Sequence, residues 1–501
     1  MVTTTALLGL LVAVLVVFAA FGAWYARGRI ETVEDYITAR NSTGGGALTA
    51  TVVASSMGAW ILFSPAEAGA AFGGITAVAG YAAGSALALA AFAVVGPRIR
   101  TLLPAGHSLT EYAYARYGPI MYGYVLLVSV AYMFVFLAAE FTGIASALSL
   151  IAGVPDWQTA AVVGGTVLLY TGYGGLRASM VTDTVQTALI LPLLIVSVVV
   201  TLLALGGTDA VHATVVDAAP ELLTLGAPSG LEFGAYVVVA IVGAEMLNQA
   251  WWQRVYAASD EGTLRRSFLV AAVAVVPMVF LAGVFGPVAV GLGLVEAPGD
   301  ASVSFFLVVT EVLPDTAVIA VAVLAVLLVV SSADTLFNAI ASVVTVDLPR
   351  IVDLSDAGLT AAARAVTVVV AAAATVVGAQ GYSVLTLFLL ADLLAAATFV
   401  PLLYGLYSQR AWSGGVATAS ATGLVVGLAF FPPARAVLPL SALPAASYFV
   451  SFVGAAVVST GLAAVTARLG NRRYDLDRLD RDVRRLDDDG ALADGHGGDR
   501  R

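Results

Sequence analysis

The fold depends on the stretch Ala54-Ser55-Ser56-Met57-Gly58-Ala59-Trp60, which is followed by Ser64-Pro65 and lies in the middle of an apolar segment, residues 46–70. Such a segment is long enough to cross a bilayer as a helix, but serines next to a glycine continue a helix poorly. A break there frees backbone carbonyls, which need a partner inside a membrane. The stretch therefore predicts a broken membrane helix with a binding site at its middle; the alternative is a kink whose small residues pack against neighbouring helices.

Apolar segments of this length recur along the whole chain. Of the 501 residues, 60% are hydrophobic and 11% are charged, whereas a soluble domain has roughly 25% charged residues. The sequence therefore predicts an all-α polytopic membrane protein. Its thirteen expected spans cover residues 5–26, 46–70, 74–97, 122–152, 157–175, 183–206, 232–256, 268–292, 315–346, 359–380, 383–408, 412–431 and 445–466.

The arginines indicate how these spans are oriented. The chain has no lysine, and basic residues are enriched in cytoplasmic loops. If the N-terminus lies outside, every arginine except Arg435 falls in an inside loop or in the C-terminal tail. We therefore expect a multi-pass protein of the cell membrane with its N-terminus outside and its C-terminus in the cytoplasm.

Composition also limits the chemistry. The chain has no cysteine, and His107, His212 and His496 fall outside the expected spans, so thiolate and imidazole metal sites are not expected in the membrane. An intramembrane hydrolase would have to rely on a serine and a carboxylate alone, which favours a transporter over an enzyme. We expect no cofactor other than a coupling ion, and no nucleic-acid partner. The net charge of −10 with no lysine suits a halophile; a GC-rich genome is the alternative.

Six acidic residues lie inside the expected spans, where ionisable groups are costly and usually functional. We find no basic residue deep in a span to pair with them, so their carboxylates would suit sodium or protons. Some of them could instead lie near span ends or cap helices. The six are Glu67, Glu140, Asp183, Glu245, Asp334 and Asp392.

Two later spans also carry polar residues at their middle. The seventh contains Gly243-Ala244-Glu245, where we expect a second break beside a carboxylate, and the ninth contains Ser331-Ser332. Paired hydroxyls could supply oxygen ligands to a cation. Alternatively, the serines could bond carbonyls of their own helix, four residues earlier.

Three motifs together resemble the sodium:solute symporter family, which includes proline, glucose, iodide, pantothenate and urea carriers. One runs from Tyr170 to Ala178 and continues as Thr182-Asp183-Thr184-Val185-Gln186, with a tight inside turn expected at Gly174-Gly175. The second is Asn248-Gln249 followed by Gln253-Arg254. The third is the pairing of residues 54–57 with Ser331-Ser332.

The resemblance implies a leucine-transporter-type fold with a 5+5 inverted repeat. Residues 46–206 would form the first repeat (spans 2–6), and residues 207–408 would form an outside loop and the second repeat (spans 7–11). The first span and its inside loop (1–45) and the last two spans (409–466) would be peripheral. Residues 467–501 would form a charged cytoplasmic tail. Independently of the resemblance, the spacing of Leu476, Leu479, Val483 and Leu486 predicts a short amphipathic helix that lies on the membrane or on inside loops; a coiled-coil partner site is the alternative.

The same resemblance implies a sodium site between the second and ninth spans. Asp183 matches an acid on the sodium release path. Ser56 stands where proline carriers have an aspartate, so one carboxylate of those relatives is missing here. The implied ligands are the backbone carbonyls of Ala54, Met57 and Leu328 and the hydroxyls of Ser331 and Ser332.

The solute would bind beside this sodium. A carboxylate at position 245 could bind an amine, an amide or urea, so an amino acid or urea is the expected solute. Proton coupling is the alternative to sodium, and the sequence leaves the oligomeric state open; Trp60 could also simply pack against lipid. The expected solute contacts are Ser56, Trp60, Tyr132, Glu140, Ala244 and Glu245.

Overall fold

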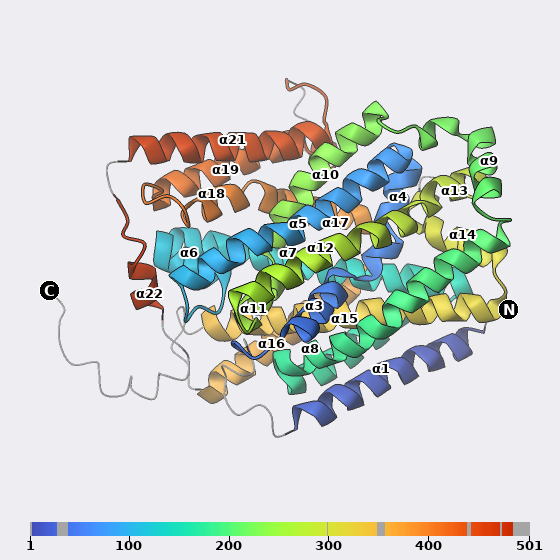
Figure 1. The fold of residues 1–501 in the computed structure, drawn as a ribbon, viewed down its shortest axis with the longest axis horizontal. Helices are drawn as coiled ribbons and strands as arrows, with labels where there is room; N and C mark the ends of the chain where they lie inside the picture. The colour runs from blue at the N-terminus through green and yellow to red at the C-terminus, as the bar shows by residue number, and fades with distance from the viewer. Residues whose placement is uncertain are drawn as a thin grey trace.

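A computed structural model describes residues 3–27, 39–297, 299–347, 356–437, 442–470 and 473–483. The described residues form helices and no strand; a single bridge joins Thr43 to Ala258. Most helices run side by side along the long axis of the molecule (Figure 1). The α-helices are α1 (Thr4–Ala26), α3 (Gly45–Ser56), α4 (Ser64–Ala71), α5 (Gly74–Leu102), α6 (Leu109–Tyr117), α7 (Pro119–Ala152), α8 (Asp156–Ala204), α9 (Thr208–Ala218), α10 (Pro228–Leu247), α11 (Gln249–Ala257), α12 (Glu261–Gly283), α13 (Phe285–Gly291), α14 (Ser304–Val312), α15 (Asp315–Asp347), α16 (Asp356–Gly378), α17 (Val384–Ala396), α18 (Phe399–Tyr404), α19 (Ser413–Phe430), α20 (Pro432–Val437), α21 (Tyr448–Leu469) and α22 (Arg478–Asp482).

Within the described residues, ten helices are long and apolar enough to cross a membrane, or eleven if one bent pair is counted as a span. These eleven coincide with eleven of the thirteen expected spans. The remaining two expected spans, 157–175 and 359–380, correspond to the first part of α8 and to α16. The all-helical membrane architecture is confirmed, and the count of thirteen stays a prediction.

The expected break in the second span is present. Helix α3 ends at Ser56, Met57 and Gly58 are extended, and a short 3-10 helix, η1 (Ala59–Leu62), follows before α4. The two halves of this span are bent by 58°. Gly58 leaves the room that the break needs, because a Cβ atom at this position would lie 2.0 Å from Glu140 Oε1.

Helix α8 contains both the fifth and the sixth expected spans in one helical assignment of 49 residues. A straight helix of that length would measure about 73 Å, more than twice the apolar thickness of a bilayer. Thr4 donates to the carbonyl of Ala152 just before α8, and α9, just after it, is drawn at the same N-terminal end of the bundle (Figure 1). The chain therefore reverses within α8. Gly174 and Gly175, where the turn was expected, are included in the residue range of α8. The side chains of residues 167–175 are not among those that the structure describes.

The second break lies three residues later than expected. Helix α10 continues through Gly243 and Glu245 and ends at Leu247, and Asn248 is extended. The Asn248 side chain accepts a hydrogen bond from the Ala250 amide and so caps α11. Gly243 serves packing instead, since a Cβ there would lie 2.9 Å from Ala396 Cα.

The ninth expected span is not interrupted at its paired serines. Helix α15 is continuous from Asp315 to Asp347. Ser332 donates to the carbonyl of Leu328 at 3.0 Å, which is the within-helix bond that lets a buried serine stay in a membrane helix.

The short helix α22 of the tail packs on α6. Leu479 is fully buried, and the Tyr474 hydroxyl donates to the Ala115 carbonyl at 3.0 Å. The guanidinium of Arg116 lies 4.2 Å from the centre of the Tyr474 ring. This part of the tail therefore covers α6, through the apolar positions Leu476, Leu479 and Val483. The predicted position Leu486 lies outside the described residues.

Candidate functional site

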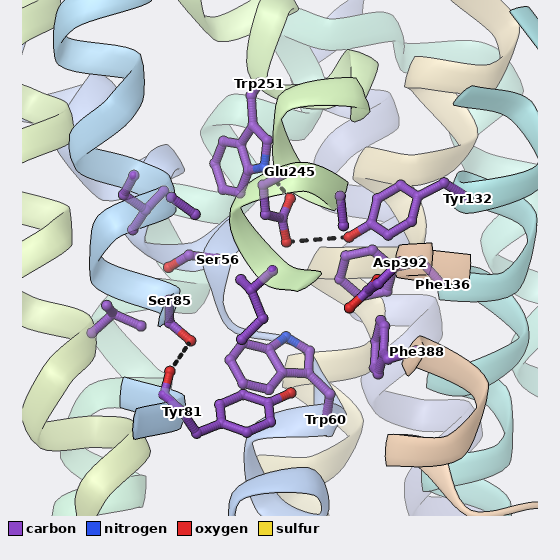
Figure 2. Close-up of a pocket in the computed structure, with 15 residues that line it drawn as sticks. Ser56, Trp60, Tyr81, Ser85, Tyr132, Phe136, Glu245, Trp251, Phe388 and Asp392 are labelled. Carbon is purple, nitrogen blue, oxygen red and sulfur yellow. Dashed lines mark hydrogen bonds between the residues drawn. The ribbon is translucent and has the colours of Figure 1, made fainter. Parts of the chain in front are cut away.

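A pocket lies between the two broken helices. Its walls come from α3 and η1, α5, α7, α10, α11, α12 and α17, and its cavity has a volume of about 40 Å³. Figure 2 shows the Glu245 carboxylate between Trp251 on one side and Trp60 with Tyr81 on the other. The lining residues are Ser56, Trp60, Tyr81, Ser85, Ala88, Leu89, Tyr132, Phe136, Ile241, Ala244, Glu245, Trp251, Val275, Phe388 and Asp392.

Five of the six expected solute contacts line this pocket. Ser56 and Trp60 come from the first break, Tyr132 comes from α7, and Ala244 and Glu245 come from the last turn of α10. They meet because both broken helices open toward the same space. The sixth, Glu140, lies at the α3 break instead.

Three neutral donors hold the Glu245 carboxylate. Tyr132 donates to Oε1 at 3.3 Å, Asn248 donates to Oε2 at 3.0 Å, and the Trp251 indole N–H also donates to Oε2. Asn248 and Trp251 can reach Glu245, in the last turn of α10, because the chain changes direction at Asn248. The carboxylate is therefore fixed in position at the pocket wall.

Asp392 from α17 is a second carboxylate in the pocket. It is 4% exposed, and its Oδ1 atom is buried with no hydrogen-bond partner. The sequence marked it as an intramembrane acid but gave no reason to place it beside Glu245, from which 147 positions separate it in the chain (392 − 245). The sequence feature that could have indicated a functional role for Asp392 is that it is the only polar residue in the apolar run 387–397.

At the α3 break, Glu140 of α7 joins the break to α15. Its Oε2 atom accepts from the Ala59 amide at 2.7 Å and from the Ser332 hydroxyl at 2.7 Å. Its Oε1 atom is buried without a hydrogen-bond partner. Ser56 brings no carboxylate to the break, and the carboxylate of Glu140 from α7 lies there instead.

The residues implied as sodium ligands lie around the same break. Ala54, Met57, Leu328, Ser331 and Ser332 are all buried. The Ala54 carbonyl accepts from the Met57 amide at 3.0 Å, and the Leu328 carbonyl accepts from Ser332. Within the described residues, no cluster of three or more His, Asp or Glu side chains could hold a metal ion, so any cation here depends on hydroxyls and carbonyls with one carboxylate.

Asp183 lies in a separate buried network toward the α11 end. Its Oδ1 accepts from Ser331 at 2.7 Å, and its Oδ2 accepts from Thr51 at 2.7 Å. Arg254 of α11 forms an ion pair with Asp183 at 3.0 Å, and both side chains are fully buried. The expectation that no basic residue pairs with the intramembrane acids is therefore wrong. Arg254 was counted with the inside loop because it lies at the end of the expected span 232–256, whereas the break at Asn248 starts a second helix, α11, which buries the Arg254 side chain against Asp183.

Broken apolar helices around a buried polar pocket define this chain as a multi-pass membrane transporter. A family model described as "Sodium:solute symporter family" matches residues 36–423. The chain belongs to the sodium:solute symporter family, whose members are transporters rather than enzymes.

Two curated relatives are similar over different lengths. The spermidine transporter DUR31 of Candida albicans is 26% identical over 82% of this chain and 76% of that protein. The probable urea active transporter 1 of Schizosaccharomyces pombe is 24% identical over 51% of this chain and 40% of its own length. The chain thus aligns with less than half of that urea carrier.

Two solved structures share the fold. A Na+-coupled sialic acid symporter in a substrate-bound outward-open state has a TM-score of 0.76 at 17% identity and covers 94% of this chain and 98% of its own. Mhp1, a nucleobase-cation-symport-1 family transporter, has a TM-score of 0.59 at 14% identity and covers 90% and 100%. Both are transporters of the leucine-transporter fold.

Proposed function

We propose that this protein is a secondary active symporter that couples downhill sodium entry to uptake of a small, polar, nitrogen-bearing organic solute by alternating access. The observation that carries the proposal is the convergence of the α3 break, Ser332 of α15 and the Glu140 carboxylate directly beside a buried pocket. The chain would have thirteen spans in a 5+5 inverted repeat, with its N-terminus outside the plasma membrane.

The coupling ion would be sodium because the groups at the break are oxygen atoms. Hydroxyls, carbonyls and carboxylates are the ligands that hard cations prefer. The proposed ligands are the carbonyls of Ala54, Met57 and Leu328 with the hydroxyls of Ser331 and Ser332. Glu140 would add the negative charge, since its free Oε1 atom has no other partner. Asp183 would receive sodium on its way to the cytoplasm.

The solute class has support from the relatives. One is named for spermidine and the other for urea, and both solutes offer N–H donors. Glu245 and Tyr132 present oxygen atoms to the same pocket, which suits a solute of that kind. Amino acids are a second candidate class, and the pocket would bind their ammonium group.

Uptake by purified protein in proteoliposomes tests the sodium site. The double variant Ser331→Ala with Ser332→Ala should raise the sodium concentration for half-maximal uptake about tenfold or more, because two oxygen ligands are lost. The matched control is Ser197→Ala with Thr201→Ala, two buried hydroxyls of α8 that bond only carbonyls four residues earlier. The control should leave sodium activation unchanged.

Two results would overturn the sodium assignment. Normal uptake by the double variant at low sodium would show that the ligands are wrong. Uptake driven by a pH gradient in the absence of sodium would establish proton coupling instead.

A further inference from the structure

The solute pocket carries two carboxylates and no opposite charge. Glu245 and Asp392 both line it, and the fifteen lining residues, all of them described, include no arginine or histidine. Two like charges in one largely apolar pocket repel each other unless a proton or another positive charge lies between them. An unpaired charge that is buried is also costly. A cation that enters the pocket would supply this opposite charge and allow both carboxylates to stay ionised.

The two carboxylates differ in the hydrogen bonds that the protein donates to them. Glu245 already has three donors from the protein, which fix its position. Asp392 has a buried oxygen without any donor. A bound solute would thus meet one anchored carboxylate and one whose hydrogen-bonding capacity is still unused.

The walls of the pocket favour an organic cation over a metal ion. Trp60 and Tyr81 stack with ring centres 5.7 Å apart, and Phe136 and Phe388 meet edge to face at 4.9 Å. Aromatic faces attract ammonium groups, and they also cover the methylene groups that such a cation carries. A metal ion would gain few ligands from these rings.

A second pocket lies on the other side of an aromatic stack from the solute site. Glu232, Ser229 and Ser447 line it, and again its described lining residues include no basic side chain. The rings of Phe233, Tyr81 and Trp60 lie between the two pockets, with successive centres 6.4 and 5.7 Å apart. The carboxylate of Glu232 gives this second pocket a negative charge, and negative charge raises the local concentration of cations. The second pocket and the solute site would therefore both attract a positively charged solute.

From this arrangement we infer that the solute is a protonated aliphatic diamine or polyamine, with one ammonium group on Asp392 and another on Glu245. Two ammonium groups balance two carboxylates, whereas urea leaves both charges uncompensated and the carboxylate of an amino acid is repelled. This inference rests on the proposed function, because it concerns the pocket of the same symporter.

A series of probes tests the charge requirement in the wild-type protein. Binding of 1,4-diaminobutane, n-butylamine and butanamide would be measured by isothermal titration calorimetry on purified protein with saturating sodium. The diamine should bind at least about tenfold more tightly than the monoamine, and the amide least, because each ammonium forms a charge-assisted bond.

Asp392→Asn gives the residue-level test, because it keeps the shape and removes the charge. It should weaken diamine binding about tenfold or more and reduce the preference for diamine over monoamine. The matched control is Glu67→Gln, another buried carboxylate, which bonds Ser383 outside the pocket. It should leave diamine binding unchanged, and thermal unfolding would show that both variants are folded.

The outcomes separate the inference from the proposed function. Sodium-dependent uptake of urea or a neutral amide, with no binding of the diamine, would overturn the diamine assignment and leave symport intact. Equal affinity of the wild type for diamine and amide would overturn it as well. Diamine uptake that ignores sodium would support the solute class and contradict sodium coupling.

Discussion

At the scale of single residues, the ion pair between Asp183 and Arg254 is the most demanding feature of the interior. Arg254 also donates to Ser55 at 2.5 Å and to Thr335 at 2.9 Å, so one guanidinium joins α3, α8, α11 and α15. Removing one partner of such a pair leaves the other charge buried and uncompensated. For sodium to reach Asp183 in the proposed cycle, this contact must loosen.

Arg254→Gln should therefore destabilise the protein strongly, by about 3–5 kcal/mol as for other broken buried pairs. The measurement is unfolding of purified protein in detergent. Arg265→Gln is the control, since Arg265 and Glu261 form only an exposed pair at 4.0 Å, and it should change stability by about 0.5 kcal/mol at most.

Adding Asp183→Asn to Arg254→Gln should recover part of the lost stability, because the uncompensated charge disappears. Additive losses in the double variant would contradict the coupling between the two side chains.

At the scale of elements, close helix contacts position the pocket walls. Helices α5 and α10 both contribute to the pocket and approach each other through Gly80 and Gly234, where a Cβ on Gly80 would lie 2.4 Å from Gly234 Cα. Small residues at such crossings are typical of membrane helices, since packing rather than hydrophobic burial holds them together.

Gly80→Val should separate α5 from α10 and destabilise the protein by about 1–3 kcal/mol, as overpacking does elsewhere. Gly123→Val in α7 is the control, because nothing lies within 4 Å of a Cβ at that position. Unfolding in detergent measures both, and equal stability of the two variants would show that the close contact is not needed.

At the scale of the whole molecule, the orientation can be tested directly. The chain has no cysteine, so a single introduced thiol is the only one that a maleimide can modify. In the proposed orientation, α9 lies outside and the loop between α18 and α19 lies in the cytoplasm. Asp217 and Arg410 are exposed residues of these two segments.

In intact cells, a membrane-impermeant maleimide should label Asp217→Cys and should leave Arg410→Cys unlabelled until the membrane is permeabilised. The reason is that the bilayer excludes the reagent from the cytoplasmic side. The opposite pattern would reverse the orientation deduced from the arginines.

The sequence by itself determined the membrane architecture, the break at Met57 and Gly58, and five of the pocket residues. The first two follow from composition, segment length and helix-breaking residues, which act locally along the chain, whereas the pocket residues were implied by the resemblance to the symporter family. The second break lies at Asn248, three residues beyond the expected Gly243-Ala244-Glu245 stretch, because whether a glycine breaks a helix or packs against a neighbour depends on what lies opposite.

Only the tertiary structure decided which polar groups meet. Glu140 reaches Ser332 across 192 positions of the chain, and Arg254 reaches Asp183 across 71. Asp392 is brought beside Glu245 in the same way. Partners in a buried site are determined by how helices pack, and no local pattern records that choice. The structure thus places isolated acids at a helix break, in an ion pair and in a pocket.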